Sequence, residues 1–450
     1  MRKTDFLFIY EVKNRELENI CLLKYELEKR GYSTELVETW EYVYKYHEPI
    51  EAKVVISFAM YNDDVYNYVA SFASKMKKVV NLQWEQIFTN ADDQKQSFRT
   101  IIGIAQQAVH ICWGPYTVRK LVSMGVPQNN IELTGHIALD FLRPELIDYY
   151  SNRTEMCKKY SLPEKYKLHL FISSFSYVGM PEKTLRSEMY QSLSYDPLEF
   201  KRISVLSQEA IFQWFRSVLL DNLSDVIIYR PHPAEIGSAI LLSMEKEFKN
   251  FFVISEESVK QWILIVDKVY TWYSTSVAEV LASGKDCVVL RPCEIPFSMD
   301  IPIYQKSKSI TTYKEFKEVF LSNEKYVSLQ KEILADYYYI DNNEPAYIKI
   351  CDVLERVITR DEYIIHQLNP TINVPLSFNR QVVKYMKYLI VGILGLICKL
   401  SLGRWLLSRF GSKYLNIGLD YNFAYKLRKK NRTSRREIRK IQERIAITLK

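Results

Sequence analysis

Apolar positions along the first half of the chain follow two different periods. Short runs rich in β-branched and aromatic residues predict strands at residues 5–10, 33–37, 53–58, 78–82, 110–113 and 130–134. Between the first two runs, residues 14–30 carry apolar side chains at approximate helical spacing and end at Gly31. A strand, a helix and a second strand in this order form the unit of a parallel sheet.

The second half of the chain repeats this alternation. Strands are predicted at residues 167–173, 225–229, 250–254, 268–272 and 286–290, and helices at residues 203–223, 234–248, 258–266 and 277–283. A polar connector over residues 140–161 ends in Ser161-Leu162-Pro163, which predicts a domain junction. We therefore expect an α/β fold of two tandem Rossmann-like domains, an N-terminal domain over residues 1–160 and a C-terminal domain over 161–360. Their facing carboxyl edges would form one ligand cleft.

Three further helices are predicted at residues 313–323, 326–338 and 344–359. We expect at least the last of them to pack back across the cleft.

The composition is that of an ordinary globular protein. Of the 450 residues, 48% are hydrophobic and 25% are charged, which excludes a disordered or fibrous protein. The seven cysteines form no Cys-x-x-Cys pair and no Cys/His cluster at zinc spacing. This cysteine pattern predicts a reducing setting without structural zinc. The apolar run at residues 6–10 is too short for a signal-peptide core, so we expect the protein in the cytoplasm.

Charge is concentrated at the C-terminal end. Residues 380–450 hold 18 Lys/Arg against three acidic residues, a net charge of +15 that leaves −7 on the rest of the chain. The uncharged apolar run at residues 388–398 is shorter than the roughly 20 residues that span a bilayer. We expect a basic, amphipathic helical tail over 380–450 that docks on an anionic membrane surface at the inner face of the cell membrane.

Two other interpretations of this tail stay open. It could form a helical bundle with a solvated basic face, or bind nucleic acid. No recognised nucleic-acid-binding module accompanies the charge, so we expect no nucleic acid partner.

The sequence Tyr229-Arg230-Pro231-His232-Pro233 directly follows an apolar strand. The two prolines fix the backbone and force an immediate turn, which holds His232 at the carboxyl edge of the sheet. Phosphates bind at this edge in such folds. His232 is therefore a candidate phosphate contact, and the alternative is a turn histidine with no ligand.

Three hydroxyl residues, Ser274, Thr275 and Ser276, follow another predicted strand and precede a helix that ends at Gly284. The free N–H groups and positive dipole of a helix N-terminus, together with these hydroxyls, predict an anion site. The alternative is a capping box, Ser276-x-x-Glu279, which needs no ligand.

These motifs resemble those of a known family. The stretch from residue 167 to 292 is similar to the C-terminal domain of bacterial GT-B glycosyltransferases with an HP motif, which include capsular Kdo transferases, polysialyltransferases and the polyglycerolphosphate transferases of teichoic acid synthesis. Residues 133–146 resemble a Thr-Gly-Asn-Pro-Arg segment of surface carbohydrate biosynthesis proteins. His136-Ile137-Ala138 replaces the Asn-Pro-Arg triplet here, so the function of that triplet does not carry over.

The resemblance implies that the domain over residues 1–160 binds the acceptor and the domain over 161–360 binds the nucleotide donor. It also implies a role for each matching residue. His232 would contact the donor phosphate together with Ser274, Thr275 and Ser276, and Glu279 would lie against the donor ribose. Arg230 would add positive charge, or else form a surface ion pair. The resemblance favours a cytidine-activated donor as substrate and requires no cofactor. The chain has no Asp-x-Asp motif, so we expect metal-independent transfer.

The general base is predicted separately. Glu85 lies in Gln83-Trp84-Glu85-Gln86, directly after the strand at residues 78–82, and thus at the carboxyl edge of the first domain. Shielding by Trp84 would raise the pKa of this carboxyl group and suit it to take a proton from an acceptor hydroxyl. The alternative is a glutamate at a helix start.

Two classes of function follow. The first is a glycosyltransferase that moves a sugar or polyol phosphate from a nucleotide-activated donor to a glycan or lipid-linked glycan acceptor of a bacterial surface polysaccharide. The second is a non-catalytic GT-B-like protein that binds nucleotide or glycan as a scaffold of a membrane-associated assembly complex. Nucleotide-sugar 2-epimerases share the fold, but a membrane-docking tail is unexpected in them.

Overall fold

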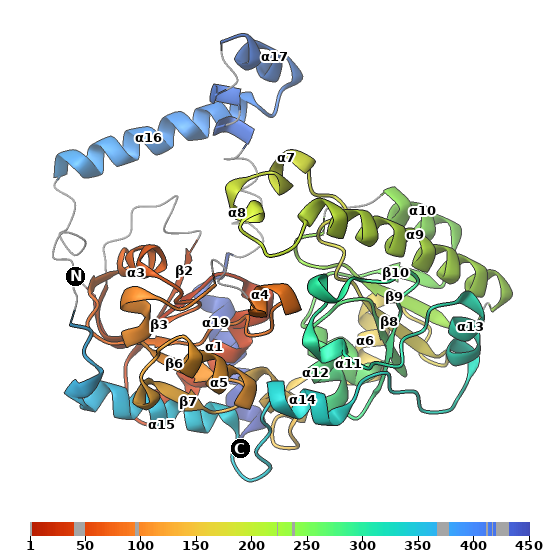
Figure 1. Ribbon diagram of the computed structural model, residues 1–450, viewed down its shortest axis with the longest axis horizontal. Coiled ribbons are helices and arrows are strands. Elements are labelled where there is room, and N and C mark those ends of the chain that lie inside the picture. Colours follow the sequence, from red (N-terminus) through yellow and green to blue (C-terminus); the bar gives the residue numbers. More distant parts are fainter. Residues whose placement is uncertain are drawn as a thin grey trace.

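Two parallel β-sheets with flanking helices form two Rossmann-like domains in tandem (Figure 1). The computed structural model describes residues 2–39, 50–94, 99–222, 224–235, 239–366, 378–410, 413–415, 417–419 and 432–450. The predicted α/β fold with two tandem domains and a helical C-terminal region is confirmed.

The N-terminal sheet has seven strands, with the order β2-β1-β3-β5-β6-β7 and β4 paired to β3. Its strands are β1 (Lys3–Tyr10), β2 (Thr34–Glu38), β3 (Ile50–Ser57), β4 (Ala73–Lys75), β5 (Val79–Asn81), β6 (Val109–Cys112) and β7 (Ile131–Leu133). Its helices include α1 (Lys13–Lys29), α3 (Asp63–Ala70), α4 (Asn90–Gln94) and α5 (Pro115–Ser123). Because β1 and β3 are adjacent, the residues that follow them meet at the centre of the carboxyl edge.

The C-terminal sheet has five strands in the order β10-β9-β8-β11-β12. Its strands are β8 (Leu168–Ile172), β9 (Val226–Arg230), β10 (Phe251–Val253), β11 (Lys268–Thr271) and β12 (Asp286–Val289). Its helices include α6 (Arg153–Tyr160), α7 (Glu182–Leu185), α8 (Glu188–Gln191), α9 (Pro197–Asp221), α10 (Ala239–Glu247), α11 (Val259–Ile265), α12 (Val277–Ala282), α13 (Tyr313–Leu321) and α14 (Lys331–Tyr337). The strands that carry the two predicted phosphate-binding segments, β9 and β11, lie on either side of β8.

Helix α15 (Ala346–Thr359) crosses back and packs on α1 and β3 of the first domain, as predicted. Ile350, Cys351 and Leu354 are buried in the same core as β1 and α1. The carboxylate of Asp140 accepts hydrogen bonds from the backbone N–H groups of Ala346 (3.0 Å) and Tyr347 (2.7 Å), which fixes the start of the helix. The range 161–360 is therefore not one packing unit, because its last helix belongs to the N-terminal core.

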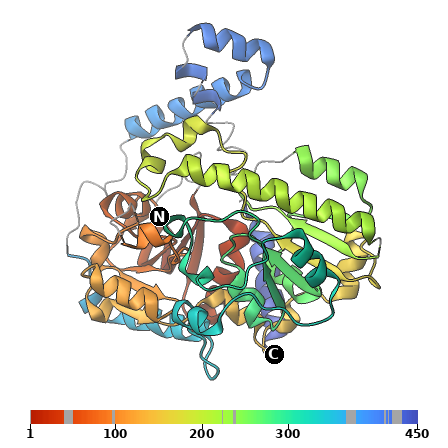
Figure 2. The same cartoon turned by 45° about the vertical axis from the view of Figure 1, so that its right-hand side comes forward.

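The C-terminal range 380–450 also divides into two parts, which corrects its description as one tail. Helix α19 (Arg435–Thr448) packs on α1, with Ile445 fully buried in the N-terminal core and an ion pair of 2.6 Å between Lys13 and Glu437. Helices α16 (Phe378–Ile397) and α17 (Ser401–Phe410) lie instead at the opposite end of the molecule, beyond α7 and α8 (Figures 1 and 2). Residues 426–440 hold nine of the 18 Lys/Arg of this range, and residues 426–431 lie outside the described residues.

Candidate functional site

The turn after β9 holds His232 through a network centred on Glu235. One carboxylate oxygen of Glu235 accepts the backbone N–H of His232 (3.1 Å) and the hydroxyl of Ser173 (2.6 Å), and the other accepts the hydroxyl of Tyr229 (2.7 Å). The N–H of Ala234 donates to Nδ1 of His232 (3.1 Å). Because Nδ1 accepts, the neutral ring carries its proton on Nε2, which is the atom able to donate to a phosphate oxygen.

The hydroxyl segment after β11 is held mainly through its backbone. The carbonyls of Ser274 and Thr275 accept the hydroxyls of Tyr304 (2.7 Å) and Tyr338 (3.3 Å). The Ser274 hydroxyl accepts the N–H of Ser276 (3.2 Å), and Ser276 makes no side-chain cap hydrogen bond to α12. The alternative of a capping box at this position is therefore wrong.

Glu279 lies half-buried on α12, which packs against the turn Ile137–Leu142 of the N-terminal half. Burial raises the pKa of this carboxyl group, although the charge of Lys260 opposes the shift. Lys260 is itself buried and crosses to the N-terminal domain, where its Nζ lies 3.4 Å from Glu18 and 3.3 Å from Asn19. Glu279 is thus at the boundary between the two domains.

Arg230 does not form the surface ion pair considered as its alternative role. Its buried guanidinium donates to the carbonyls of Glu256 (2.7 Å) and Glu257 (2.5 Å), in the loop after β10. Burial lowers the pKa of Arg230 to about 10, although the nearby carboxylates act to raise it. We assign Arg230 to holding this loop beside the His232 turn.

Glu85 differs from its prediction in its electrostatics. Its carboxylate lies 2.8 Å from both Arg15 and Arg99. Burial acts to raise the pKa of Glu85, but the charges of Arg99 and Arg15, a hydrogen bond from Arg15 and the charge of His232 outweigh it and leave the pKa lowered. The predicted raised pKa is wrong, and so is the helix-start alternative, since α4 begins only at Asn90.

Glu11, which directly follows β1, has the raised pKa that was predicted for Glu85. Burial, and then repulsion from Glu16 and Glu85, raise the pKa of Glu11 to about 7 against the opposing charge of Arg15. The backbone N–H of Glu11 donates to the fully buried Glu16 (2.8 Å). The sequence contained one signal for this residue, a carboxylate immediately after a central strand, but none for its neighbours Arg15 and Arg99.

Two groups of residues lie on the two sides of the domain boundary. We call Glu11, Arg15, Glu16, Glu85 and Arg99 the charged wall, and His232, Ser274, Thr275, Ser276 and Glu279 the hydroxyl wall. The charge of His232 acts on Glu85, which places the two walls within electrostatic reach of each other.

A histidine that did not match its family segment lies at the same boundary. His136 is 8% exposed, contacts the ring of Trp113 at 3.9 Å between centroids, and has no hydrogen-bond partner for its Nδ1. Burial lowers its pKa to about 3, aided by the charges of Lys260 and Arg15. His136 is therefore neutral, and it lies within electrostatic reach of Arg15 in the charged wall.

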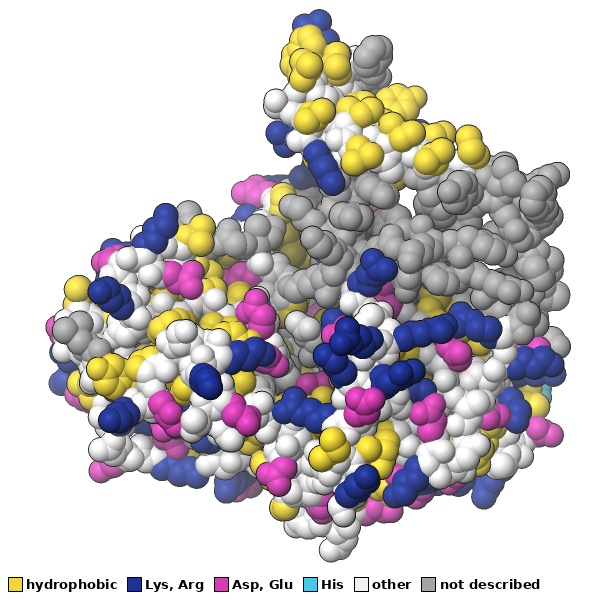
Figure 3. All heavy atoms as spheres, turned by 180° about the vertical axis from the view of Figure 1, so that it is seen from behind, with side chains coloured by type: hydrophobic (Ala, Val, Ile, Leu, Met, Phe, Trp, Pro, Cys, Tyr) yellow, Lys and Arg dark blue, Asp and Glu magenta, His cyan; other side chains and the backbone are white. Residues whose placement is uncertain are grey.

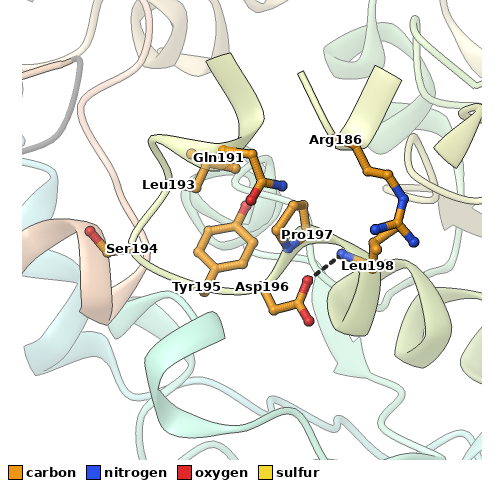
Figure 4. A pocket seen from close by; sticks show the side chains of 8 residues that line it. All are labelled: Arg186, Gln191, Leu193, Ser194, Tyr195, Asp196, Pro197 and Leu198. Atoms are coloured by element: carbon orange, nitrogen blue, oxygen red, sulfur yellow. Dashed lines mark hydrogen bonds between the residues drawn. The ribbon is translucent and has the colours of Figure 1, made fainter. Parts of the chain in front are cut away.

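The larger of two described cavities, about 550 Å³, opens beside this boundary rather than within it. In Figure 4, Gln191, Tyr195 and Pro197 lie together at its centre, while Arg186 lies across from them and Ser194 points toward the N-terminal domain. The N–H of Ser194 donates to Asp92 (2.9 Å), and the charge of Arg99 acts on Tyr195. One side chain of the cavity, Tyr195, is thus coupled to the charged wall.

The second cavity, about 290 Å³, lies at the chain's C-terminal end, between residues 143–146, 345–347 and 448–450. Neither cavity is lined by a residue of the hydroxyl wall. Over the part of the chain that the structure describes, no group of three or more His, Cys, Asp or Glu side chains is placed to hold a metal ion.

No protein-family model and no curated protein sequence matches the chain. Among solved structures, a variant of the wall teichoic acid polymerase TagF is similar over 79% of this chain and 89% of that one, with 14% identity and a TM-score of 0.50. A TagF structure with CDPG has 12% identity, the same TM-score of 0.50, and coverage of 79% and 88%.

A UDP-GlcNAc 2-epimerase from Neisseria meningitidis bound to UDP-GlcNAc is similar over 78% of this chain and all (100%) of that one, with 11% identity and a TM-score of 0.49. At these identities the TagF similarity shows a shared GT-B-like fold, and the fold alone.

Proposed function

We propose that the chain is a metal-independent glycosyltransferase that moves a sugar or polyol phosphate from a nucleotide-activated donor to a bacterial surface polysaccharide acceptor. The observation that carries this proposal is the juxtaposition of His232, rigidly held at one carboxyl edge, with the charged wall of the other domain. Such a transfer requires a hydrogen-bond donor to the phosphate on one side and a proton acceptor on the other.

The hydroxyl wall would bind the donor. Nε2 of His232 would donate to the phosphate oxygen on which charge develops, with Ser274, Thr275 and Ser276 as further donors and Glu279 against the ribose. The TagF structure with CDPG supports a cytidine-activated donor, because that protein shares the fold.

The charged wall would activate the acceptor. We assign the general base to Glu11 rather than Glu85, since a carboxylate with a pKa of about 7 accepts a proton near neutral pH far better than one paired with two arginines. The acceptor oxygen bonds to the transferred group as its proton passes to Glu11. The bond to the nucleotide phosphate oxygen breaks, and its electron pair stays on the departing phosphate beside His232.

The acceptor would enter from the 550 Å³ cavity, whose Tyr195 is coupled to Arg99 of the charged wall. A glycan or lipid-linked glycan fits a polar cavity of this size. We place the enzyme in the cytoplasm, peripheral at the inner face of the cell membrane, where such an acceptor would be built.

The test is turnover of a panel of cytidine- and uridine-activated donors by the purified protein, followed by mass spectrometry. We expect slow donor hydrolysis without acceptor and transfer with one, both lost in His232→Ala and kept in the control His366→Ala, which removes an exposed histidine elsewhere. Binding without turnover would favour the scaffold instead. Inversion at C2 of the sugar would favour an epimerase, and no binding of any donor would refute the proposal.

A further inference from the structure

Helices α16 and α17 carry a continuous set of exposed apolar side chains. On α16 these side chains recur at helical spacing along one face, and they continue through the connection onto α17. They are Met386, Leu389, Ile390, Ile393, Leu396, Leu400, Leu402, Trp405 and Leu406, with Leu396 and Leu400 exposed by 62% and 66%. We call this set the apolar face, and it is visible at the end of the molecule in Figure 3. A soluble surface does not gather so many apolar residues without a partner.

The pair has a small core of its own. Cys398 and Leu407 are buried, and a Cβ on Gly418 would lie 2.4 Å from Sγ of Cys398. The two segments Leu389–Ile397 and Ser401–Arg409 meet at a bend of 117°. The apolar face is therefore the outer surface of a folded pair, and not its interior.

The charge of the segment indicates what covers the apolar face. Residues 378–419 contain seven Lys/Arg and no Asp or Glu. Arg409 lies over the ring of Trp405 at 4.6 Å, the kind of aromatic–basic pair found where one side is apolar and the other wet. An apolar surface bordered only by cations complements an anionic lipid leaflet.

Three observations argue against a transmembrane span. No single described helix is long and apolar enough to cross a bilayer, and the bent pair passes that test only with both segments together. Lys399 lies at the bend, which would be the deepest point of an inserted hairpin, where a charge is costly. Finally, α15 before the pair and α19 after it both pack on the N-terminal domain, so both flanking helices belong to one folded body.

We propose that α16 and α17 lie in the plane of an anionic lipid leaflet with the apolar face inserted, and that α19 does not bind lipid but fastens the chain to the N-terminal domain. The inference rests on the proposed location at the membrane and deepens it. Since the pair lies beyond α7 and α8 (Figures 1 and 2), the cavity beside α8 would be held near the leaflet that carries a lipid-linked acceptor.

The first test is co-sedimentation of the full chain with phosphatidylglycerol-containing vesicles and with pure phosphatidylcholine vesicles. We expect binding to the anionic vesicles that high salt releases only in part, and at least about tenfold weaker binding to the neutral ones. The triple variant Leu389→Ser/Ile393→Ser/Leu396→Ser should bind at least about tenfold more weakly. The control replaces three apolar residues on other helices that are somewhat more exposed, Leu220→Ser/Leu242→Ser/Ile447→Ser.

The second test measures depth. The fluorescence of Trp405 is the difference between the wild type and Trp405→Phe. Lipids brominated near the headgroups should quench it more strongly than lipids brominated near the chain ends. Stronger quenching at the chain ends would overturn the in-plane arrangement. Equal vesicle binding by the apolar-face variant and its control would overturn the docking surface.

Donor hydrolysis in vesicle-free solution separates this inference from the proposed function. The apolar-face variant should hydrolyse donor like the wild type, because the pair lies outside both walls. A variant that keeps hydrolysis but loses vesicle binding supports the docking surface, and a wild type that binds vesicles without turning over any donor refutes only the transferase.

Discussion

The two walls of the domain boundary differ in how they are built. The hydroxyl wall comes from two short segments that follow β9 and β11, on either side of β8, and hydrogen bonds between backbone and side-chain groups hold both segments. The charged wall gathers titratable side chains from the residue after β1, from α1, from the loop after β5 and from Arg99, and the pKa values of Glu11 and Glu85 depend on their charged neighbours. A rigidly held wall of hydrogen-bond donors suits binding of a phosphate, whereas a wall of interacting charges suits transfer of a proton.

Loss of the proton acceptor should have the largest effect. Glu11→Gln should lower transfer by about 10²–10⁴-fold, because the amide cannot take the acceptor proton. The wild-type rate should rise with pH through about 7, as Glu11 loses its proton, and the variant should lack this limb. Steady-state rates against pH check both, with Glu35→Gln, a partly exposed glutamate on β2, as control. An unchanged profile would remove Glu11 from this role.

Loss of the hydrogen bond from His232 to the phosphate should have the next largest effect. His232→Ala should lower both transfer and donor hydrolysis by roughly 10²–10³-fold, since the developing charge on the departing phosphate loses a hydrogen bond. The fold should persist, because Glu235 still accepts the backbone N–H at position 232. Circular dichroism checks the fold and single-turnover kinetics the rate. Wild-type turnover in this variant would show that the hydroxyl wall does not act through this histidine.

Glu85→Gln should have a smaller effect, of a different kind. The substitution removes a negative charge that raises the pKa of Glu11, so the rising limb of the pH profile should move to lower pH. Arg15→Gln should move it in the opposite direction, because Arg15 lowers that pKa. If both substitutions shift the limb the same way, the coupling within the charged wall is not electrostatic.

The smallest effect concerns the support of the charged wall. Asp140→Ala removes the acceptor for two N–H groups at the start of α15 and should lower the free energy of unfolding by about 0.5–2 kcal/mol. Chemical denaturation measures this loss, with the exposed Asp148→Ala as control. Equal stability of the two variants would mean that α15 is held by its apolar contacts alone.

Local sequence accounts for the hydroxyl wall and for every described strand except the three-residue β4, because each of these depends on a pattern within a few residues. The turn at Pro231-His232-Pro233 follows from backbone restriction alone. The charged wall does not follow from local sequence, since Arg15 and Arg99 are 84 positions apart in the chain and come together at Glu85 only in the folded domain. The predicted rise in the pKa of Glu85 was wrong for this reason. The neighbouring Trp84 could be read from the sequence, but the proximity of the two arginines could not.

The C-terminal helices show the same limit. An amphipathic basic pattern occurs in α19 as well as in α16 and α17, and nothing in the pattern says which surface the apolar side meets. Ile445 meets the N-terminal core, whereas Leu396 and Trp405 remain exposed.

The central claim is that the donor phosphate binds between the two walls, and a crystal structure of the full chain with a cytidine- or uridine-activated donor tests it most directly. The account predicts the donor phosphate within hydrogen-bonding distance of Nε2 of His232, with the transferred group directed toward Glu11. A donor bound with its phosphate in the cavity lined by Arg186 and Tyr195, away from His232, would contradict it.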